Sequence, residues 1–111
     1  MVKLIILFRA GERPAGYDQQ YNEFLMKLES LPGVRKKAVN FVYAGPGGAA
    51  PFRSVVEIYF DDRPALDAAL ISPEGVESGN YLNAFAGADA IIMFSDVMEE
   101  AYEKSSSEST S

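Results

Sequence analysis

The sequence predicts a single α+β domain, in which a four-stranded antiparallel sheet carries its helices on one face. Segments typical of strands and of helices follow one another in the order β-α-β-β-α-β. Right-handed crossovers between them place the first and third strands at the centre of the sheet and both helices on the same side. A length of 111 residues and an apolar content of 48% suit one domain with one core.

The first strand, residues 2–9, is apolar on both of its faces. One face carries Val2, Leu4, Ile6 and Phe8, and the other carries Ile5 and Leu7 between Lys3 and Arg9. A strand with two apolar faces belongs inside a sheet that is covered on both sides. Because the chain has enough helix for one side only, we expect something else to cover the other.

The first helix is predicted over residues 17–31, because apolar side chains recur there at helical spacing. These side chains are Tyr17, Tyr21, Phe24, Leu25, Leu28 and Leu31. Before the helix, residues 10–16 are rich in glycine and proline and indicate a turn. After it, Pro32 and Gly33 are typical of a helix end.

The next two strands are predicted at residues 35–44 and 53–61. Large apolar side chains alternate along both segments, as in strands of a sheet with two distinct faces. Between them, residues 45–51 are mostly glycine, proline and alanine. A loop of this length is a long but ordinary connection between two strands.

The second helix is predicted to break into two halves. Asp62 is placed to cap a first half over residues 63–71. Ser72 and Pro73 repeat this start signal and open a second half, which should end at Gly87.

The last strand is predicted at residues 89–99, which contain a run of large apolar side chains. Residues 1–102 then form the single domain. The serine-rich residues 103–111 have a composition that cannot bury a core, and we interpret them as a flexible tail.

The composition excludes several classes of chemistry. The chain has no histidine and no cysteine, so it has no imidazole base, no thiolate nucleophile and no His or Cys metal ligand. We expect neither a metal site nor a cofactor. A net charge of −6 disfavours nucleic acid as a partner, and no segment is long and apolar enough for a membrane span. A soluble, cytoplasmic, acidic domain is the resulting expectation.

The uncovered sheet face predicts a homodimer packed sheet to sheet. Soluble monomers rarely expose apolar patches larger than a few hundred Å². Covering roughly 800 Å² per subunit would contribute on the order of 10 kcal/mol of gross stabilisation, which compares with the whole stability of such a domain. The alternative is a monomer in which the 45–51 loop or the tail folds over the face.

Four features of the sequence stand in a characteristic order. They are Val2–Phe8 at the N-terminus, Leu31-Pro32-Gly33-Val34 at the end of the first helix, the strand end Glu57-Ile58-Tyr59-Phe60, and the helix start Ser72-Pro73-Glu74-Gly75. In this order they resemble the EthD family, and the resemblance covers about residues 1–100. The resemblance implies a ferredoxin-like domain that dimerises into an α/β barrel with the helices outside.

The resemblance also implies a function involving small organic molecules. Wider relatives of the family include monooxygenases, isomerases and cyclases. Many family members carry an aromatic-and-histidine pattern in the first helix, and here Phe24 stands near the position of that histidine. A histidine-based activity is therefore not implied for this chain.

Glu57 and Tyr21 are the candidate catalytic residues. Glu57 lies in the middle of a strand that is expected to be central, where loss of water would raise the pKa of its carboxyl toward the range useful for proton transfer. That holds if the carboxylate is unpaired. The alternative is a salt bridge with Lys3 or Arg9 of the neighbouring strand, or a pair at the dimer interface.

A wider set of aromatic and amide side chains could line a pocket for an organic molecule. The set consists of Tyr17, Tyr21, Phe24, Asn40, Tyr59, Tyr81 and Phe85. The alternative for the aromatic residues is ordinary core packing. For Asn40 it is a hydrogen bond that satisfies the backbone of a strand edge.

Two functions are compatible with these patterns. In the first, an apolar pocket holds a small organic substrate of a cofactor-independent enzyme, with hydrogen bonds from Tyr21 and Asn40 and proton transfer by Glu57 or a tyrosine. In the second, the chain is a non-catalytic binding or stress-related module that keeps the fold but has lost the family's histidine.

Overall fold

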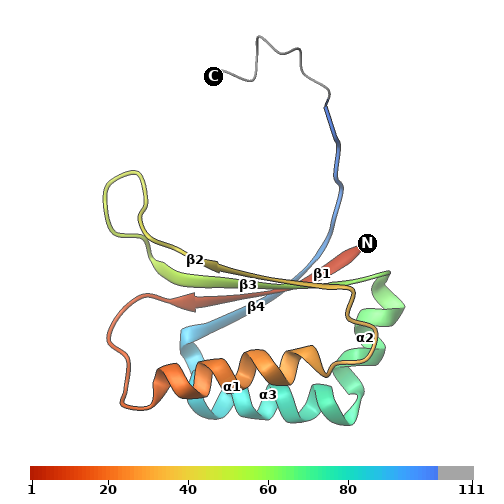
Figure 1. The fold of residues 1–111 in the computed structure, drawn as a ribbon, viewed down its shortest axis with the longest axis horizontal. Helices are drawn as coiled ribbons and strands as arrows, with labels where there is room; N and C mark the ends of the chain where they lie inside the picture. The colour runs from red at the N-terminus through yellow and green to blue at the C-terminus, as the bar shows by residue number, and fades with distance from the viewer. Residues whose placement is uncertain (103–111) are drawn as a thin grey trace.

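The computed structural model describes residues 1–102 and confirms the predicted ferredoxin-like α+β fold (Figure 1). A four-stranded sheet has the order β2-β3-β1-β4, and all neighbouring strands run antiparallel. The elements are β1 (Val2–Arg9), α1 (Tyr17–Glu29), β2 (Lys36–Phe41), β3 (Phe52–Phe60), α2 (Arg63–Ile71), α3 (Pro73–Phe85), the 3-10 turn η1 (Gly87–Asp89) and β4 (Ala90–Asp96). The predicted tail at residues 103–111 lies outside the described residues.

Several elements are shorter than predicted. α1 ends at Glu29 rather than at Leu31, because its last turn tightens and the Leu31 amide bonds the carbonyl of Leu28 just before Pro32. β2 ends at Phe41 rather than at Ala44, and β4 ends at Asp96. Within residues 1–102, no helix is long and apolar enough to cross a bilayer.

Strand register decides which side chains face away from the helices. Ile5 of β1 lies opposite Glu57 of β3 and Met93 of β4, and Leu7 lies opposite Val55 and Ile91. Since side chains directly across an antiparallel pair share a face, the open face carries Ile5, Leu7, Val55, Glu57, Tyr59, Ile91 and Met93.

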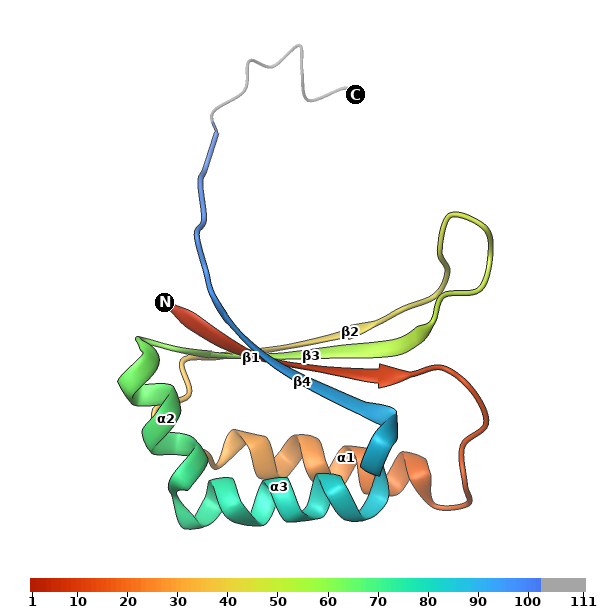
Figure 2. The same ribbon diagram turned by 180° about the vertical axis from the view of Figure 1, so that it is seen from behind.

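The open face has no second layer within residues 1–102. α1 and α3 lie side by side against one face of the sheet, and α2 stands at its end (Figures 1 and 2). The 42–51 loop and residues 97–102 leave the sheet at its two ends and project away from the helices, without lying across the open face. The apolar part of this face is therefore uncovered within residues 1–102 (Figure 1).

The core fills the space between the sheet and the helices. Its most deeply buried side chains are Phe8, Phe24, Phe60, Ile6, Ile58 and Val56. Phe8 sits at the centre, where its ring meets those of Tyr21 and Phe85 at centroid distances of 5.0 and 6.3 Å. This aromatic packing holds α1 and α3 over the end of β1.

Both predicted caps of the broken helix are confirmed. The Asp62 carboxylate accepts a hydrogen bond from the Ala65 amide at 2.9 Å, and the Ser72 hydroxyl accepts one from the Gly75 amide at 3.0 Å. Each cap satisfies an amide that has no partner within its own helix. The chain therefore turns sharply between α2 and α3.

Gly75→Ala is expected to destabilise the fold by about 3 kcal/mol, because the turn leaves no room for a side chain. A Cβ at residue 75 would lie 2.1 Å from the carbonyl oxygen of Ala69 and 2.6 Å from that of Leu70. Gly79 is the matched control, since a Cβ there meets nothing within 4 Å. Gly79→Ala should be neutral or stabilising by up to about 1 kcal/mol. Urea denaturation checks both values, and equal stability of the two variants would contradict this account of the turn.

Candidate functional site

A β-bulge in β3 redirects the Arg53 side chain. Phe8 of β1 lies opposite Ser54, whereas the next residue, Arg9, lies opposite Phe52. Arg53 is thus an extra residue in β3, and an extra residue of this kind changes the direction of a side chain. The Cζ atom of Arg53 lies 4.9 Å from the centre of the Tyr17 ring, on the helix side of the sheet.

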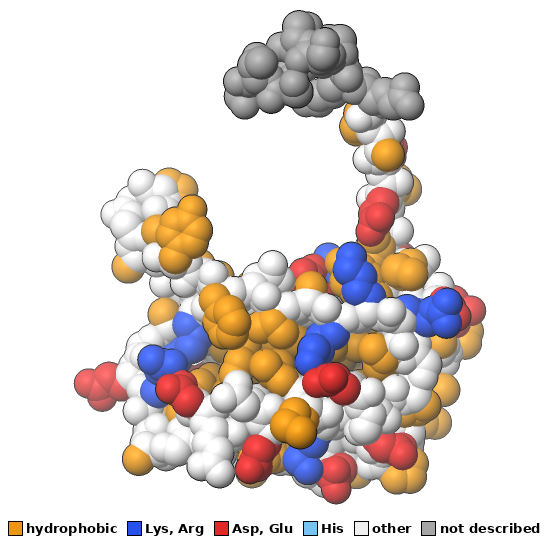
Figure 3. Space-filling view, in the orientation of Figure 1, with side chains coloured by type: hydrophobic (Ala, Val, Ile, Leu, Met, Phe, Trp, Pro, Cys, Tyr) orange, Lys and Arg blue, Asp and Glu red, His pale blue; other side chains and the backbone are white. Residues whose placement is uncertain are grey.

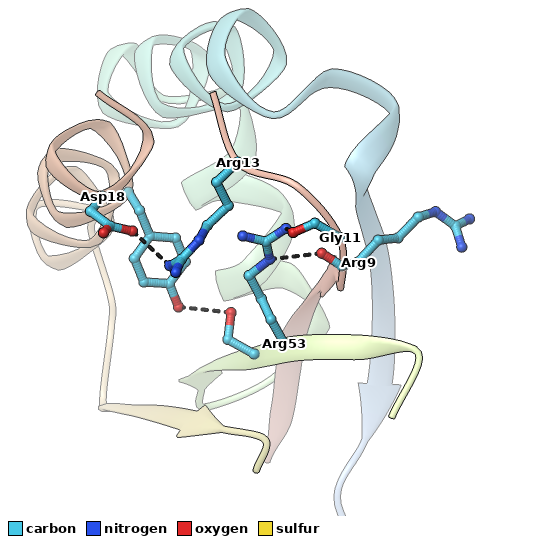
Figure 4. A network of polar contacts seen from close by, with 7 residues as sticks. Arg9, Gly11, Arg13, Asp18 and Arg53 are labelled. Carbon is cyan, nitrogen blue, oxygen red and sulfur yellow. Dashed lines mark hydrogen bonds and ion pairs between the residues drawn. The ribbon is translucent and has the colours of Figure 1, made fainter. Parts of the chain in front are cut away.

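Two hydrogen bonds hold the Arg53 guanidinium in place (Figure 4). Its Nε donates to the carbonyl oxygen of Arg9 at 2.8 Å, and one terminal nitrogen donates to that of Gly11 at 2.9 Å. Gly11 has a φ of 133°, a conformation that favours glycine. The guanidinium therefore ties the turn after β1 to β3, while the Arg9 side chain points away from it.

A cavity of about 440 Å³ lies beside this guanidinium, between the start of α1, the end of β2 and the start of β3. Figure 3 shows hydrophobic side chains gathered between α1 and the sheet, with charged side chains around them. We call this 440 Å³ cavity the bulge cavity. Its main walls are Arg13, Tyr17, Tyr21, Phe41, Arg53 and Ser54. The volume falls in the range of pockets that hold small organic molecules.

The floor of the bulge cavity is a buried hydrogen bond. The Tyr21 hydroxyl donates to the Ser54 hydroxyl at 3.0 Å, and both residues are buried. Burial raises the pKa of Tyr21, although the bond to Ser54 acts in the opposite direction. Burial likewise raises the pKa of Tyr17, against the influence of the nearby Arg53. Both phenols therefore keep their protons at neutral pH and serve as hydrogen-bonding groups.

Charge around the bulge cavity is unevenly paired. Arg13 donates to the Asp18 carboxylate at 2.8 Å, which compensates its charge. Among residues 1–102, no ion pair includes Arg53. Two guanidiniums and one carboxylate thus line a cavity that also has aromatic walls.

Glu57 and Asn40 lie on the open face, away from the bulge cavity. Lys3 forms an ion pair with Glu57, and the Asn40 side-chain amide donates to Glu57 at 3.0 Å and to the Val55 carbonyl at 3.1 Å. The bond from Lys3 lowers the pKa of Glu57, which outweighs the effect of burial. The condition for a raised pKa, an unpaired Glu57 carboxylate, is not met, because the structure shows the salt-bridge alternative with Lys3.

Tyr59 also belongs to this open-face cluster. Its ring is buried between the ammonium groups of Lys3 and Lys36, which lie 5.5 and 4.8 Å from the ring centre. Contacts of this kind between a cation and an aromatic ring are attractive. Glu57 and Tyr59 lie on the open face, whereas Tyr21 lies on the helix side of the sheet. Tyr21 and Glu57 therefore do not share one pocket.

Phe24 and Phe85 pack between the helices and the sheet, whereas Tyr81 contacts α1 at the partly exposed surface of the helix layer. Phe24 is buried in the core, and Phe85 packs against Tyr17 and Phe24 at centroid distances of 5.6 and 5.8 Å. Tyr81 donates to the Glu23 carboxylate at 2.5 Å and lies under the Lys27 ammonium. Of the predicted set, the structure places Tyr17 and Tyr21 in the bulge cavity.

Sequence reasoning missed Arg13, Phe41, Arg53 and Ser54. Strict alternation along β3 would put Arg53 on the open face with Val55, and the bulge that overturns this has no clear signal in the sequence. Ser54 stood in the alternating set that faces the core, where a buried hydroxyl needs a partner. That need was the signal that could have linked Ser54 to a tyrosine of α1.

Tyr21→Phe is expected to destabilise the fold by about 1–2 kcal/mol, because it leaves the buried Ser54 hydroxyl without its partner. Tyr43→Phe is the matched control, since the Tyr43 side chain is fully exposed and should lose nothing. Thermal denaturation measures both. Adding Ser54→Ala to Tyr21→Phe should recover part of the loss, and a further loss of the same size would contradict the proposed pairing.

Within residues 1–102, no cluster of three or more His, Cys, Asp or Glu side chains is placed to hold a metal ion. The described donors of the bulge cavity are guanidiniums, hydroxyls and the paired Asp18 carboxylate. These groups suit hydrogen bonding to an organic molecule better than metal coordination.

Comparison with known proteins finds similarity among solved structures. The chain is similar to an EthD family protein from Bacillus halodurans, with 32% identity, a TM-score of 0.84 and coverage of 88% of this chain and 99% of the other. No protein-family model and no curated protein matches it.

Two more distant structures share the fold alone. A dimeric ferredoxin-like protein of unknown function from Jannaschia is 20% identical, with a TM-score of 0.69 and coverage of 86% of this chain and 98% of the other. A cofactor-independent oxygenase from Streptomyces nogalater is 15% identical, with a TM-score of 0.64 and coverage of 92% and 97%.

Proposed function

The chain belongs to the EthD family, and we propose that it is a homodimer whose subunits each bind a small organic molecule in the bulge cavity. The observation that carries the binding proposal is the cavity itself, with aromatic walls, a buried Tyr21–Ser54 hydrogen bond and a fixed guanidinium. Pockets built from apolar walls and a few placed polar groups are the usual form of small-molecule sites.

The open sheet face supports the homodimer. It carries the apolar side chains of Ile5, Leu7, Val55, Ile91 and Met93, and no segment of residues 1–102 lies across it. Similar solved structures are described as dimeric ferredoxin-like proteins. A second copy offers the same apolar face, so a two-fold axis can pair the two faces.

Binding is the function that the geometry supports better than acid–base catalysis. Glu57 lies on the other face of the sheet and is paired with Lys3. Tyr21 lines the bulge cavity, but burial raises its pKa and keeps it protonated. Neither candidate therefore supplies a base inside the cavity at neutral pH.

Binding can be tested with benzyl alcohol and benzoate as probes, by nitrogen-15 NMR of the full chain. We expect at least one of them to shift the amide signals of Tyr17, Tyr21 and Ser54, while those of Ile5 and Met93 on the open face stay in place. No shift with either compound at millimolar concentration, or shifts confined to the open face, would contradict the proposal.

Phe41→Ala is expected to weaken binding of the better probe about three- to ten-fold, because it removes one aromatic wall of the cavity. Phe94→Ala is the matched control. Phe41 and Phe94 are both exposed aromatic residues on edge strands, but Phe94 does not line the bulge cavity. Equal loss in the two variants, measured by NMR titration, would place the site elsewhere.

A further inference from the structure

We infer that the ligand of the bulge cavity is an organic acid, with its carboxylate on Arg53 and Arg13 and its apolar body on the rings of Tyr17, Tyr21 and Phe41. This inference rests on the proposed function, because it names the class of molecule for the same cavity. It depends on three features of the described residues, which are the free donors of Arg53, the exposed Arg13–Asp18 pair and the aromatic walls.

Arg53 retains donors and charge for an anion. A guanidinium has five N–H donors, and the hydrogen bonds to the carbonyls of Arg9 and Gly11 use two of them. Both partners are neutral, so these bonds orient the guanidinium without cancelling its charge. Within residues 1–102, no carboxylate is paired with Arg53. The planar fork suits a carboxylate, which accepts two parallel hydrogen bonds.

Arg13 can supply a second contact at little cost. It enters the same cavity from the turn before α1, as Figure 4 shows beside Arg53. Its present partner, Asp18, is exposed, with side-chain exposures of 52% for Arg13 and 75% for Asp18. Ion pairs as exposed as this contribute little. A ligand carboxylate can therefore replace Asp18 as the partner of Arg13.

The walls select the rest of the ligand. The Tyr17 and Tyr21 rings are stacked at a centroid distance of 6.1 Å, and the Phe41 ring lies 6.4 Å from that of Tyr21. These surfaces favour a flat or aromatic body over a polar one. The protein has a net charge of −6, which repels anions in general, so a cavity lined by two guanidiniums and only one carboxylate is a local exception. An acid with an apolar body satisfies both features.

The test compares benzoate with benzyl alcohol, a neutral molecule of similar size, by NMR titration at low salt. Benzoate is expected to bind about ten-fold more tightly or better, and added salt should weaken benzoate alone. Inorganic phosphate, which has charge but no apolar body, should bind more weakly than benzoate. Equal affinity of benzoate and benzyl alcohol would overturn the inference and leave the proposed function standing. Failure of both to bind would instead overturn the proposed function, and the inference with it.

Variants separate charge from structure. Arg53→Gln should bring benzoate down to the affinity of benzyl alcohol, and Arg13→Gln should weaken benzoate several-fold more than it weakens benzyl alcohol. If Arg53→Gln unfolds the turn because the hydrogen bonds of Arg53 are lost, Arg13→Gln still tests the inference. Arg35→Gln is the control, since Arg35 pairs with Asp61 and does not line the cavity. Unchanged benzoate binding in folded Arg53→Gln or in Arg13→Gln would overturn the inference.

Discussion

Ile5→Asp is expected to convert the dimer into a monomer. Ile5 lies between Glu57 and Met93 in the middle of the open face, so the new carboxylate would be buried against the partner, where the nearby Lys3 is already paired with Glu57. An unpaired buried charge costs several kcal/mol, which corresponds to a weakening of the dimer by about a thousand-fold or more. Val55→Asp, on the neighbouring strand, should have the same effect. Sedimentation velocity measures the loss directly.

The matched control is Met26→Asp on α1. Met26 is an apolar residue on the exposed surface of the helix layer, so a charge there stays in water and should leave the dimer unchanged. Two open-face variants that remain dimeric with unaltered stability would contradict a sheet-to-sheet arrangement.

Lys3→Met is expected to cost about 1–3 kcal/mol of stability in the proposed dimer, because it removes the ion-pair partner of Glu57, which keeps only the bond from Asn40. The double variant Lys3→Met with Glu57→Leu removes both charges and should recover most of that loss. Asn40 keeps its bond to the Val55 carbonyl in both variants. Urea denaturation measures the free energies, and a double variant that is less stable than Lys3→Met would contradict this account of the pair.

The Lys3–Glu57 pair contributes to stability only within a limited range of pH. The bond to Lys3 lowers the pKa of Glu57, so the contribution of Glu57 is present above its unfolded pKa of about 4.3 and is lost as the pH falls through the lower, folded value. The bond to Glu57 raises the pKa of Lys3. The stability that Lys3 contributes is therefore present below its unfolded pKa of about 10.4, and it is lost as the pH rises through the higher pKa of the folded state.

The pair should therefore contribute fully between about pH 5 and pH 10. At both extremes of pH, the free energy of unfolding should depend less on pH in the double variant, Lys3→Met with Glu57→Leu, than in the native chain. An identical pH dependence in both would show that the pair does not contribute.

The fold was predictable because its signals are local. The cap at Asp62 and the Ser72-Pro73 start act through bonds to amides three residues further on, and the structure has them as expected. The alternation along residues 2–9 predicted two apolar faces. It could not say which face met the helices, because both were apolar, and the strand pairing and helix packing decided that.

The candidate site was only partly predictable because it depends on contacts between distant segments. Tyr17 and Tyr21 were found from helical spacing, but Arg53 reaches them through a bulge that breaks the strand alternation. Glu57 was singled out for its central position, and its ion pair with Lys3, 54 residues away in the chain, decided its pKa. Such pairings follow from register, which the sequence pattern constrains without specifying each partner.

In the proposed dimer, two copies of the chain cover each other's open faces. Sedimentation equilibrium of the unaltered protein at micromolar concentration tests this dimer most directly, because it gives the mass in solution without reference to shape. We predict a mass about twice the 12.1 kDa of the single chain, unchanged on dilution within that range. A stable mass of 12.1 kDa would contradict the proposed dimer.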